Sequence, residues 1–541
     1  MKARTDQGRA SEAIADFRAI LPMDGVLADD ATLDRYSRST QRTGTRPSCV
    51  LYPTTTAAVQ DIVRAAAARK VVVYPVSRGN NWGYGDACAP TEGAAIIDLS
   101  RMNRILTVDP DLAYCVIEPG VSQKQLYDHL QENKTRLWMD CTAAGPDTSV
   151  VGNALERGIG HTRYGDHVRT CCGLEVVLAD GRVLHTGFGH FPKAQATHVY
   201  PYGLGPQLDG LFFQSNFGLV TKFGLWLMPE PDAFTFYYVQ AEHHEDLPHV
   251  VNAMRRLKLD GVINTAVHIG NDFRVWGGTG RFPWDRTGGK APIPPEVREQ
   301  LRRETGVRAW QASGSFTGTK AHVNASKAAL KEALGNRCSV VFVDDQKLGR
   351  GESLANVLNT FGAGAVLKEK MRALRPNYEL LKGNPVLQTL LSAQWRLRQP
   401  PDGPGNPLDS GCGAYWVSPV VPMTGDHATR FYAMADAIMR EHGFDTNVSL
   451  ILVNERALVC TVSVAFDKSV DGEPEQAEAC YQELMEAFLA EGYVVYRSGL
   501  QSMDTIRAHD SVFWDVTAQL KAAIDPNDII ARGRYVPPLP S

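Results

Sequence analysis

Two glycine-rich segments carry the residue types that bind a phosphate-containing ligand. The first runs from Pro75 to Gly85, directly after an apolar run, and combines glycine with serine, asparagine and arginine. Glycine tolerates unusual backbone dihedral angles and has no Cβ, so such a loop lets several backbone N–H groups converge on an anion. The segment matches neither the Rossmann fingerprint nor the P-loop. Taken alone, it is also typical of a tight structural turn.

The second segment spans residues 148–167 and places serine, asparagine and histidine between its glycines. A chain of this composition can lie flat against a polar, planar or pyrophosphate ligand, because glycine leaves the backbone accessible. By itself it is also an ordinary loop. If the two segments meet in the fold, they would form a cradle for a dinucleotide.

Helical and extended patterns alternate along the first part of the chain and would position these segments. Residues 57–70 have apolar side chains at helical spacing, and the β-branched run 71–74 predicts a buried strand that enters the first segment. Ser122 is expected to cap a helix. Strands mixed with helices indicate an α+β or α/β fold. Further strands are predicted at 95–99, 114–118 and 175–179.

A domain boundary is expected at Pro229-Glu230-Pro231, which follows an apolar strand at 225–228. Beyond it, long helices alternate with strands up to about residue 495, and the C-terminal tail is expected to be helical over 504–523. The helices are predicted at 427–442 and 475–491, the strands at 448–453 and 459–465, and surface loops at 281–295 and 399–413.

The bulk composition sets further limits. A chain of 541 residues is too long for one compact core, so two or more domains are expected. The net charge of -4 argues against an extended nucleic-acid surface. No apolar run approaches the ~20 residues of a membrane span, and the N-terminus lacks a signal-peptide pattern, so we expect a cytoplasmic protein. Ten cysteines without a CxxC pair predict buried, reduced thiols and no metal site.

The order of the motifs along the chain is more specific than any one of them. In this order, the sequence resembles the vanillyl-alcohol oxidase / p-cresol methylhydroxylase family of flavoproteins over nearly its whole length. The similarity is densest over residues 70–230 and 410–535. The blocks that carry it are Pro75–Gly85, Val116–Val121, Ser149–Asn153, Tyr164–His167, Gly210–Phe212, Gln214–Asn216, Gly218–Lys222 and Asp525–Arg534.

The resemblance implies an α+β protein with a bipartite PCMH-type FAD-binding domain and an inserted α/β cap domain. Residues 1–231 and 500–541 would form the FAD-binding domain, and residues 232–499 the cap, which binds substrate. The two glycine-rich segments would hold the pyrophosphate and isoalloxazine of FAD, with backbone and charge contacts from outside them. The implied FAD-binding residues are Pro75, Ser77, Arg78, Gly79, Asn80, Asn81, Ser149, Gly152, Asn153, Gly160, His161, Val220 and Arg534.

The resemblance also implies a site for a phenol. Tyr84 stands where the family has a tyrosine that binds the substrate phenol, and Tyr496 and Arg497 resemble the family's Tyr-Arg pair for the same oxygen. A phenol has a pKa of about 10, and a guanidinium with two phenolic donors in a dry pocket would favour its phenolate. The phenolate pushes electron density to the para carbon, so hydride can leave the benzylic position toward flavin N5 and give a p-quinone methide. A regular strand at Tyr496 and Arg497 would send only one of the two side chains into the pocket.

Two residues are candidates for the acid–base group beside the flavin. The family's oxidase branch has an aspartate near flavin N5, and in this sequence the corresponding loop, residues 140–147, is one residue longer. Asp147 is the candidate catalytic base, or else a turn residue after Pro146. His161 stands where relatives carry a tyrosine and would contact flavin or substrate, or only satisfy backbone groups. His167 follows the family pattern and is interpreted as structural.

The sequence departs from the family at the positions that tether FAD covalently. Ala414 stands where the oxidase branch has its histidine, no histidine lies between Gln399 and Pro422, and Asn81 occupies the position of the berberine-bridge type of link. No match to the tyrosyl link of the methylhydroxylases is found either. We therefore predict non-covalent FAD, with Cys412 as an alternative attachment point that is more typical of a packing residue.

Two rival functions remain open. The chain could be an FAD-dependent oxidase or dehydrogenase of a non-phenolic alcohol, amine or polyketide, with Tyr84 and Arg497 binding a carboxylate or carbonyl. It could also be a non-catalytic flavin- or ligand-binding protein. As partners we expect a small aromatic substrate, oxygen or an electron-accepting protein, and a second copy of the chain in a homodimer or larger assembly. We expect neither nucleic acid nor a membrane.

Overall fold

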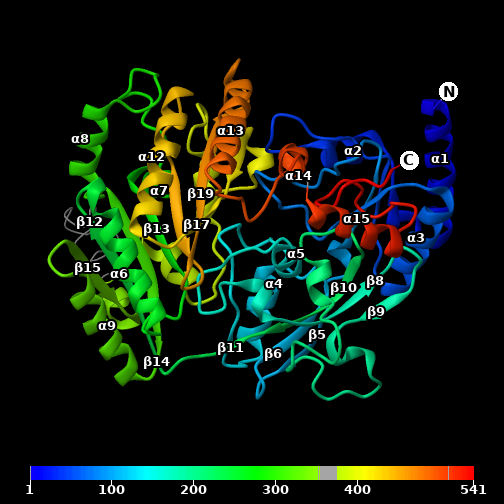
Figure 1. Cartoon of the computed structure of the whole chain (residues 1–541), viewed down its shortest axis with the longest axis horizontal. Helices are drawn as coiled ribbons and strands as arrows, with labels where there is room; N and C mark the ends of the chain where they lie inside the picture. Colours follow the sequence, from blue (N-terminus) through cyan, green and yellow to red (C-terminus); the bar gives the residue numbers. More distant parts are fainter. Residues whose placement is uncertain (1, 351–352, 354–373, 510, 541) are drawn as a thin grey trace.

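The computed structural model describes residues 2–350, 353, 374–509 and 511–540. Two parts lie side by side (Figure 1): one holds the N-terminal segment, in blue to cyan, together with the C-terminal end, in red, and the other holds the middle of the chain, in green to orange. This arrangement confirms the predicted α+β fold with a bipartite domain and an inserted cap. The boundaries at residues 231 and 500 stay a prediction.

A four-stranded sheet lies at the start of the N-terminal part, in the order β1-β2-β4-β3, with β2 and β3 parallel to β4. Strand β3 begins two residues later than predicted. Lys70 adopts a left-handed conformation (φ 54°) that ends the preceding helix, and the Val71 N–H still donates to the Ala66 carbonyl of that helix (3.0 Å). The elements are α1 (Lys2–Ile20), β1 (Val26–Leu27), α2 (Asp30–Ser37), β2 (Cys49–Leu51), α3 (Thr56–Arg69), β3 (Val73–Val76) and β4 (Ala95–Asp98).

A five-stranded antiparallel sheet follows, in the order β5-β6-β10-β8-β9, and a short pair joins β11 to β7. Ser122 caps α4 as predicted, because its hydroxyl accepts a hydrogen bond from the Gln125 N–H (3.1 Å). The elements are β5 (Ile105–Asp109), β6 (Tyr114–Ile117), α4 (Gln123–Glu132), β7 (Leu137–Trp138), α5 (Val150–Leu155), β8 (Cys171–Val177), β9 (Val183–His185), β10 (Leu219–Trp226) and β11 (Met228–Pro229).

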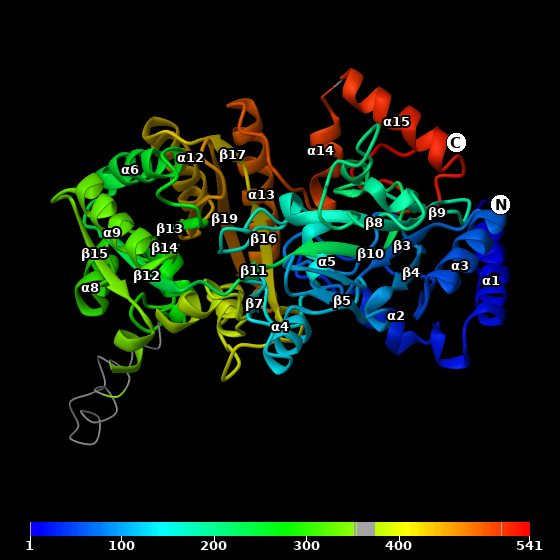
Figure 2. The same cartoon turned by 90° about the horizontal axis from the view of Figure 1, so that it is seen from below.

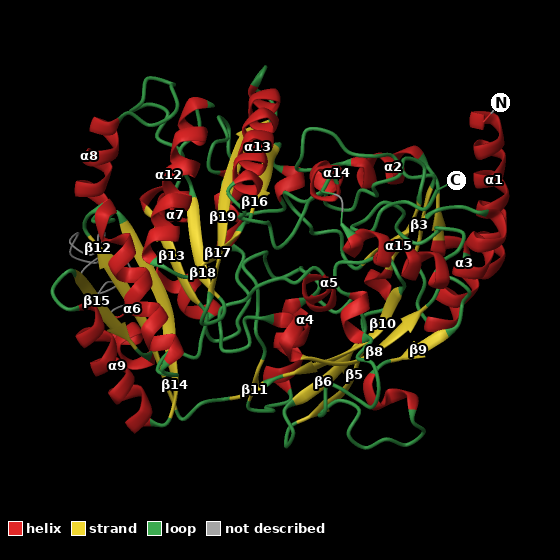
Figure 3. Cartoon of the chain, in the orientation of Figure 1, coloured by secondary structure: helices red, strands yellow, loops and turns green. Residues whose placement is uncertain are grey.

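The cap is an antiparallel sheet in the order β15-β12-β14-β13-β18-β19-β16, with β17 paired to β19. Helices α6, α9, α12 and α13 pack over one face of it and share one apolar core with it (Figure 3). The elements are β12 (Ala233–Ala241), α6 (Leu247–Leu259), β13 (Val267–Asn271), α7 (Asp272–Thr279), α8 (Pro295–Thr305), β14 (Trp310–Gly318), α9 (Lys320–Leu334), β15 (Cys338–Val343), β16 (Cys412–Val417), β17 (Val420–Pro422), α12 (Gly425–Glu441), β18 (Val448–Leu452), β19 (Ala457–Asp467) and α13 (Glu473–Ala490).

Side chains alternate between the two faces of the cap sheet, as the pleat requires. The residues on one face, such as Tyr237, Ile269 and Leu450, are fully buried under the helices. The residues on the other face are mostly polar, and they point away from that core. They are Tyr238, Gln240, His268, Gln311, Ser313, Trp416, Ser449, Thr461 and Ser463.

The C-terminal tail returns to the N-terminal part, where α14 (Met503–Arg507) and α15 (Val512–Ile524) lie in Figure 2. The single helix expected over 504–523 is therefore two helices. Beyond α15, Ile530 forms a parallel bridge with Val73, and the Ala531 N–H donates to the Val73 carbonyl (2.8 Å). This backbone pairing extends the first sheet beside β3. None of the helices in the described part of the chain combines the length and apolar composition that a bilayer crossing requires.

Candidate active site

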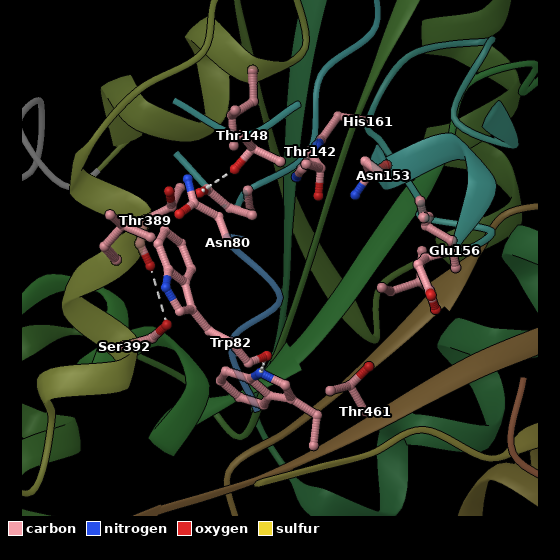
Figure 4. A pocket seen from close by; sticks show the side chains of 18 of the residues that line it. Asn80, Trp82, Thr142, Thr148, Asn153, Glu156, His161, Thr389, Ser392 and Thr461 are labelled. Atoms are coloured by element: carbon pink, nitrogen blue, oxygen red, sulfur yellow. Dashed lines mark hydrogen bonds between the residues drawn. The ribbon is translucent and has the colours of Figure 1, made fainter. Parts of the chain in front are cut away.

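A cavity of about 790 Å³ lies between the two parts. Its walls are both glycine-rich segments, the polar face of the cap sheet and the tail near Arg534. Figure 4 shows Asn80 and Trp82 of the first segment and Asn153, Glu156 and His161 of the second around one open space. Fifteen of the predicted residues line this cavity: Pro75, Ser77, Arg78, Gly79, Asn80, Asn81, Tyr84, Ser149, Gly152, Asn153, His161, Val220, Tyr496, Arg497 and Arg534.

The first glycine-rich segment presents its backbone to the cavity. Gly79 has a left-handed conformation (φ 72°) that only glycine adopts easily. In the described part of the chain, the backbone N–H groups of residues 78–81 have no hydrogen-bond partner. The Arg78 side chain ties the segment to its neighbours, donating to the carbonyl groups of Asp147 (2.7 Å) and Gly120 (3.3 Å). The segment therefore offers free donors to an anion.

The second segment meets the first at Gly152. A Cβ at this position would lie 3.0 Å from the Ser77 hydroxyl oxygen, so glycine permits the close approach of the two loops. Ser149 fixes the turn, since its hydroxyl donates to the Pro119 carbonyl (2.6 Å) and accepts from the Gly152 N–H (2.9 Å). Val220 lines the same wall at a register shift in β10, where regular pairing with β8 is interrupted.

Glu156 is the centre of an ion-pair cluster that the sequence reasoning missed. Its carboxylate accepts hydrogen bonds from Arg534 (2.9 Å) and from the Tyr535 hydroxyl (2.6 Å), and it pairs with Arg497 (3.4 Å). Burial raises the pKa of Glu156, but the positive charges of Arg534 and Arg497 outweigh it and hold the pKa below its usual value. One sequence signal could have indicated this role. Glu156 is an acidic residue inside a glycine-rich segment that is expected to bind an anion, so its charge needs a cationic partner.

Tyr84, Tyr496 and Arg497 come together at one end of the cavity. The Tyr84 hydroxyl shares a hydrogen bond with Ser418 (2.9 Å), and the Arg497 guanidinium lies 4.4 Å from the centre of the Tyr84 ring. Burial is the main cause that raises the pKa of Tyr84 well above its usual value, and the nearby Tyr496 is the second, so the Tyr84 hydroxyl stays protonated. Residues 496 and 497 form a bend instead of a regular strand, which lets both side chains reach the cavity.

His161 lines the cavity, and its ring stacks on the His268 ring at 4.3 Å. Burial lowers the pKa of both imidazoles, so both are neutral. The His161 Nδ1 is 3.1 Å from the Cys141 carbonyl, and its backbone N–H donates to Asp140 (3.1 Å). The buried Asp140 also pairs with His167 (2.6 Å), which gives His167 the structural role predicted for it.

Two predicted residues lie outside the cavity wall. The Asp147 side chain is 79% exposed, and its loop turns the carboxylate toward solvent, so the structure does not bring it to the site. Gly160 lies behind the wall, where a Cβ would be 1.5 Å from an Asp140 carboxylate oxygen. Its lack of a side chain makes room for the Asp140–His167 pair.

The cavity has unsatisfied donors that fit a dinucleotide. Buried side-chain donors without a hydrogen-bond partner among the described residues include Nε and Nη1 of Arg534 and Nε1 of Trp82. They add to the free backbone N–H groups of the first segment. Buried donors are rarely left unpaired in native proteins, so a polar ligand is expected to accept from them. The residues present therefore fit FAD, with Arg534 and the first segment as its donors.

Comparison with known proteins agrees with this geometry. A family model described as an FAD binding domain matches residues 47–187. The chain is 36% identical to the 1'-carboxy-chondrochloren decarboxylase of Chondromyces crocatus, over 97% of this chain and 96% of the relative. It is 32% identical to the 4-cresol dehydrogenase [hydroxylating] flavoprotein subunit of Pseudomonas putida, over 98% and 96%. Fold, cavity and relatives together define an FAD-dependent oxidoreductase.

Solved structures show the same fold over the whole chain. A structure of p-cresol methylhydroxylase with substrate bound superposes with a TM-score of 0.88 at 31% identity and covers 98% of both chains. The 4-ethylphenol oxidase of Gulosibacter chungangensis, in an isoeugenol complex, also gives 0.88, at 27% identity and with the same coverage. The chain belongs to the vanillyl-alcohol oxidase / p-cresol methylhydroxylase family of FAD-dependent oxidoreductases.

Proposed function

We propose that the enzyme oxidises para-substituted phenols by removing hydride from the benzylic carbon. The observation that carries this proposal is the convergence of Tyr84, Tyr496 and Arg497 in the same cavity as the FAD cradle. FAD, when bound, supplies the hydride acceptor. The protein residues supply the charge and the hydrogen bonds that turn a bound phenol into a hydride donor.

The charge balance of the cluster favours a phenolate. Glu156 neutralises one of its two guanidinium partners, so Arg497 and Arg534 together carry one excess positive charge. Tyr84 stays protonated and can donate its hydroxyl hydrogen to the phenolate oxygen. Donors placed in advance in a cavity that excludes water stabilise charge more strongly than the same donors in water. We infer that the phenol binds as its anion.

The structure also limits which group can act as the acid–base group beside the flavin. Asp147 is solvent-exposed, and Glu156 is committed to two arginines. His161 is neutral and lines the cavity, so it can accept a proton. We propose His161 as the acid–base group, in place of Asp147.

A substrate panel tests the proposed function. Mixed anaerobically with the protein, 4-alkylphenols and vanillyl-type alcohols are expected to bleach the flavin absorption, because only a phenolate oxygen in conjugation with the benzylic carbon can push hydride out. The matched 4-methoxy analogues, which cannot ionise, should leave it unchanged. Bleaching by non-phenolic alcohols alone would instead support the rival alcohol oxidase or dehydrogenase. A flavin that no compound of either class bleaches would favour a non-catalytic flavin-binding protein.

Attachment of the cofactor is the second prediction. We propose non-covalent FAD, because the candidate tether positions are unsuited. Ala414 has no nucleophile, and the Asn81 side chain is hydrogen-bonded to Arg497. The Cys412 thiol is buried outside the cavity wall, and burial raises its pKa to about 11. Intact mass of the denatured protein should equal that of the polypeptide alone, and a mass increased by one FAD would contradict the prediction.

The electron acceptor, the assembly and the location are further proposals. One relative is named a flavoprotein subunit, which supports an electron-accepting protein as well as oxygen as acceptor of the electrons. We also propose a homodimer or larger assembly in the cytoplasm.

A further inference from the structure

Arg274 differs from the other partly or fully buried arginines of the described chain. Among these, Arg298 and Arg302 pair with Asp272, Arg396 with Glu473, Arg497 and Arg534 with Glu156, and Arg507 with Asp504. Arg274 lies on α7 and lines the cavity, yet within the described residues its guanidinium has no hydrogen bond, ion pair or aromatic contact. A desolvated guanidinium without a counter-charge is costly, so its position in a binding cavity points to an anionic ligand.

The surroundings of Arg274 leave its charge available. The stacked rings of His161 and His268 are neighbours on the cavity wall, and both are neutral. The buried carboxylate that contacts His161, Asp140, is already paired with His167 (2.6 Å). Asp272, on the same helix as Arg274, is paired with Arg298 and Arg302. Arg274 therefore contributes a positive charge that no described residue balances.

A row of small residues connects Arg274 to the phenol end of the cavity. The stem of Arg274 packs above Gly270 of β13, where a Cβ would lie 2.9 Å from its Cγ. Across the sheet, Gly270 pairs with Ser449 and Ser449 pairs with Thr461. The hydroxyl groups of Thr461 and Ser418 are 3.4 Å apart. Ser418 in turn is hydrogen-bonded to the Tyr84 hydroxyl (2.9 Å).

The row sets the length of the ligand. Gly270 and Ser418 are separated by three interstrand spacings, which amount to about 14 Å. Glycine, serine and threonine leave space above the sheet along this line, and the line ends at a phenolate site on one side and at an unpaired guanidinium on the other. A ligand that satisfies both ends carries a phenol, an extended para side chain and an anionic group.

We propose that the substrate is a para-substituted phenol whose side chain bears a carboxylate, and that Arg274 binds this carboxylate. The inference rests on the proposed function and names the substrate class of the same site. Guanidinium and carboxylate match in geometry and form two parallel, charge-assisted hydrogen bonds. Arg274 thereby selects acidic phenols over neutral phenols of the same length.

The test compares acidic and neutral ligands on wild type and two variants. The ligands are 4-hydroxyphenylpropanoate, -butanoate and -pentanoate and their primary amides, with binding to the FAD-loaded protein followed by calorimetry and by the flavin spectrum. At least one acid is expected to bind wild type about 10- to 100-fold more tightly than its amide. Arg274→Met should abolish this preference and leave amide binding within about 2-fold, whereas Arg274→Lys should restore part of it.

A stability measurement separates loss of the site from loss of the fold. Without ligand, Arg274→Met should unfold at the same temperature as wild type or higher, because it removes a desolvated charge that no described residue balances. Equal binding of acids and amides by wild type, or equal weakening of both by Arg274→Met, would overturn the inference and leave the proposed function standing. If neither acids nor amides bind or bleach the flavin, the proposed function fails, and the inference fails with it.

Discussion

Replacing Arg497 with methionine is expected to slow anaerobic flavin reduction by a 4-alkylphenol about 10²- to 10³-fold. Arg497 brings a permanent charge to the phenol end, where its guanidinium lies 4.4 Å from the Tyr84 ring centre. Without that charge the bound phenol keeps its proton at neutral pH, and hydride transfer loses its driving force. The residual rate should rise with pH toward the phenol pKa near ~10, whereas wild type should be less pH-dependent in that range.

Two control variants isolate this effect. Arg497→Lys retains the charge but not the planar fork and should recover part of the rate. Asp147→Asn removes a carboxylate that is 79% exposed and should leave the reduction rate within about 2-fold of wild type. A rate unchanged in Arg497→Met, with FAD fully bound, would show that the phenol oxygen binds elsewhere. Stopped-flow absorption of the loaded enzyme measures all three variants.

Replacing Glu156 with glutamine is expected to destabilise the protein by about 3–5 kcal/mol. The substitution leaves Arg497 and Arg534 buried without a counter-charge, and it breaks the contact through which the second glycine-rich segment holds the tail at Arg534 (2.9 Å) and Tyr535 (2.6 Å). FAD retention should fall at the same time, because the same contact positions the wall of the cavity. Denaturant unfolding and flavin release on gel filtration measure the two effects.

The dependence of folding stability on pH in the acid range tests the role of Glu156 independently. Its pKa in the folded protein is lowered, so its ionised form contributes stability above the unfolded value of about 4.3, and that contribution is lost as the pH falls through the folded-state pKa. Wild type should therefore lose stability more steeply than Glu156→Gln below about pH 4.3. The control is Glu230→Gln, which removes an exposed pair with Arg136 and should cost less than about 1 kcal/mol. Equal slopes for wild type and Glu156→Gln would contradict the assigned ion pair.

The sequence by itself determined the family, the cofactor and the two glycine-rich segments of the cavity wall. Glycine-rich loops and their order are local signals, because backbone access to an anion depends on which residues lack a Cβ. Helix and strand patterns are equally local, and Ser122 is found at the cap where it was expected. These signals located the first segment and Ser149–Asn153 without knowledge of the fold, and the resemblance to the family added Tyr84 and Arg497.

Only the tertiary structure decided which charged groups meet. Glu156, Arg497 and Arg534 are far apart in the sequence, and nothing local to any of them indicates that they share one ion-pair cluster. The same holds for Asp147, whose loop turns it to solvent, and for Arg274, which α7 projects into the cavity, where no described residue pairs with it. Electrostatic roles depend on desolvation and on partners from distant segments, and both exist only after the chain has folded.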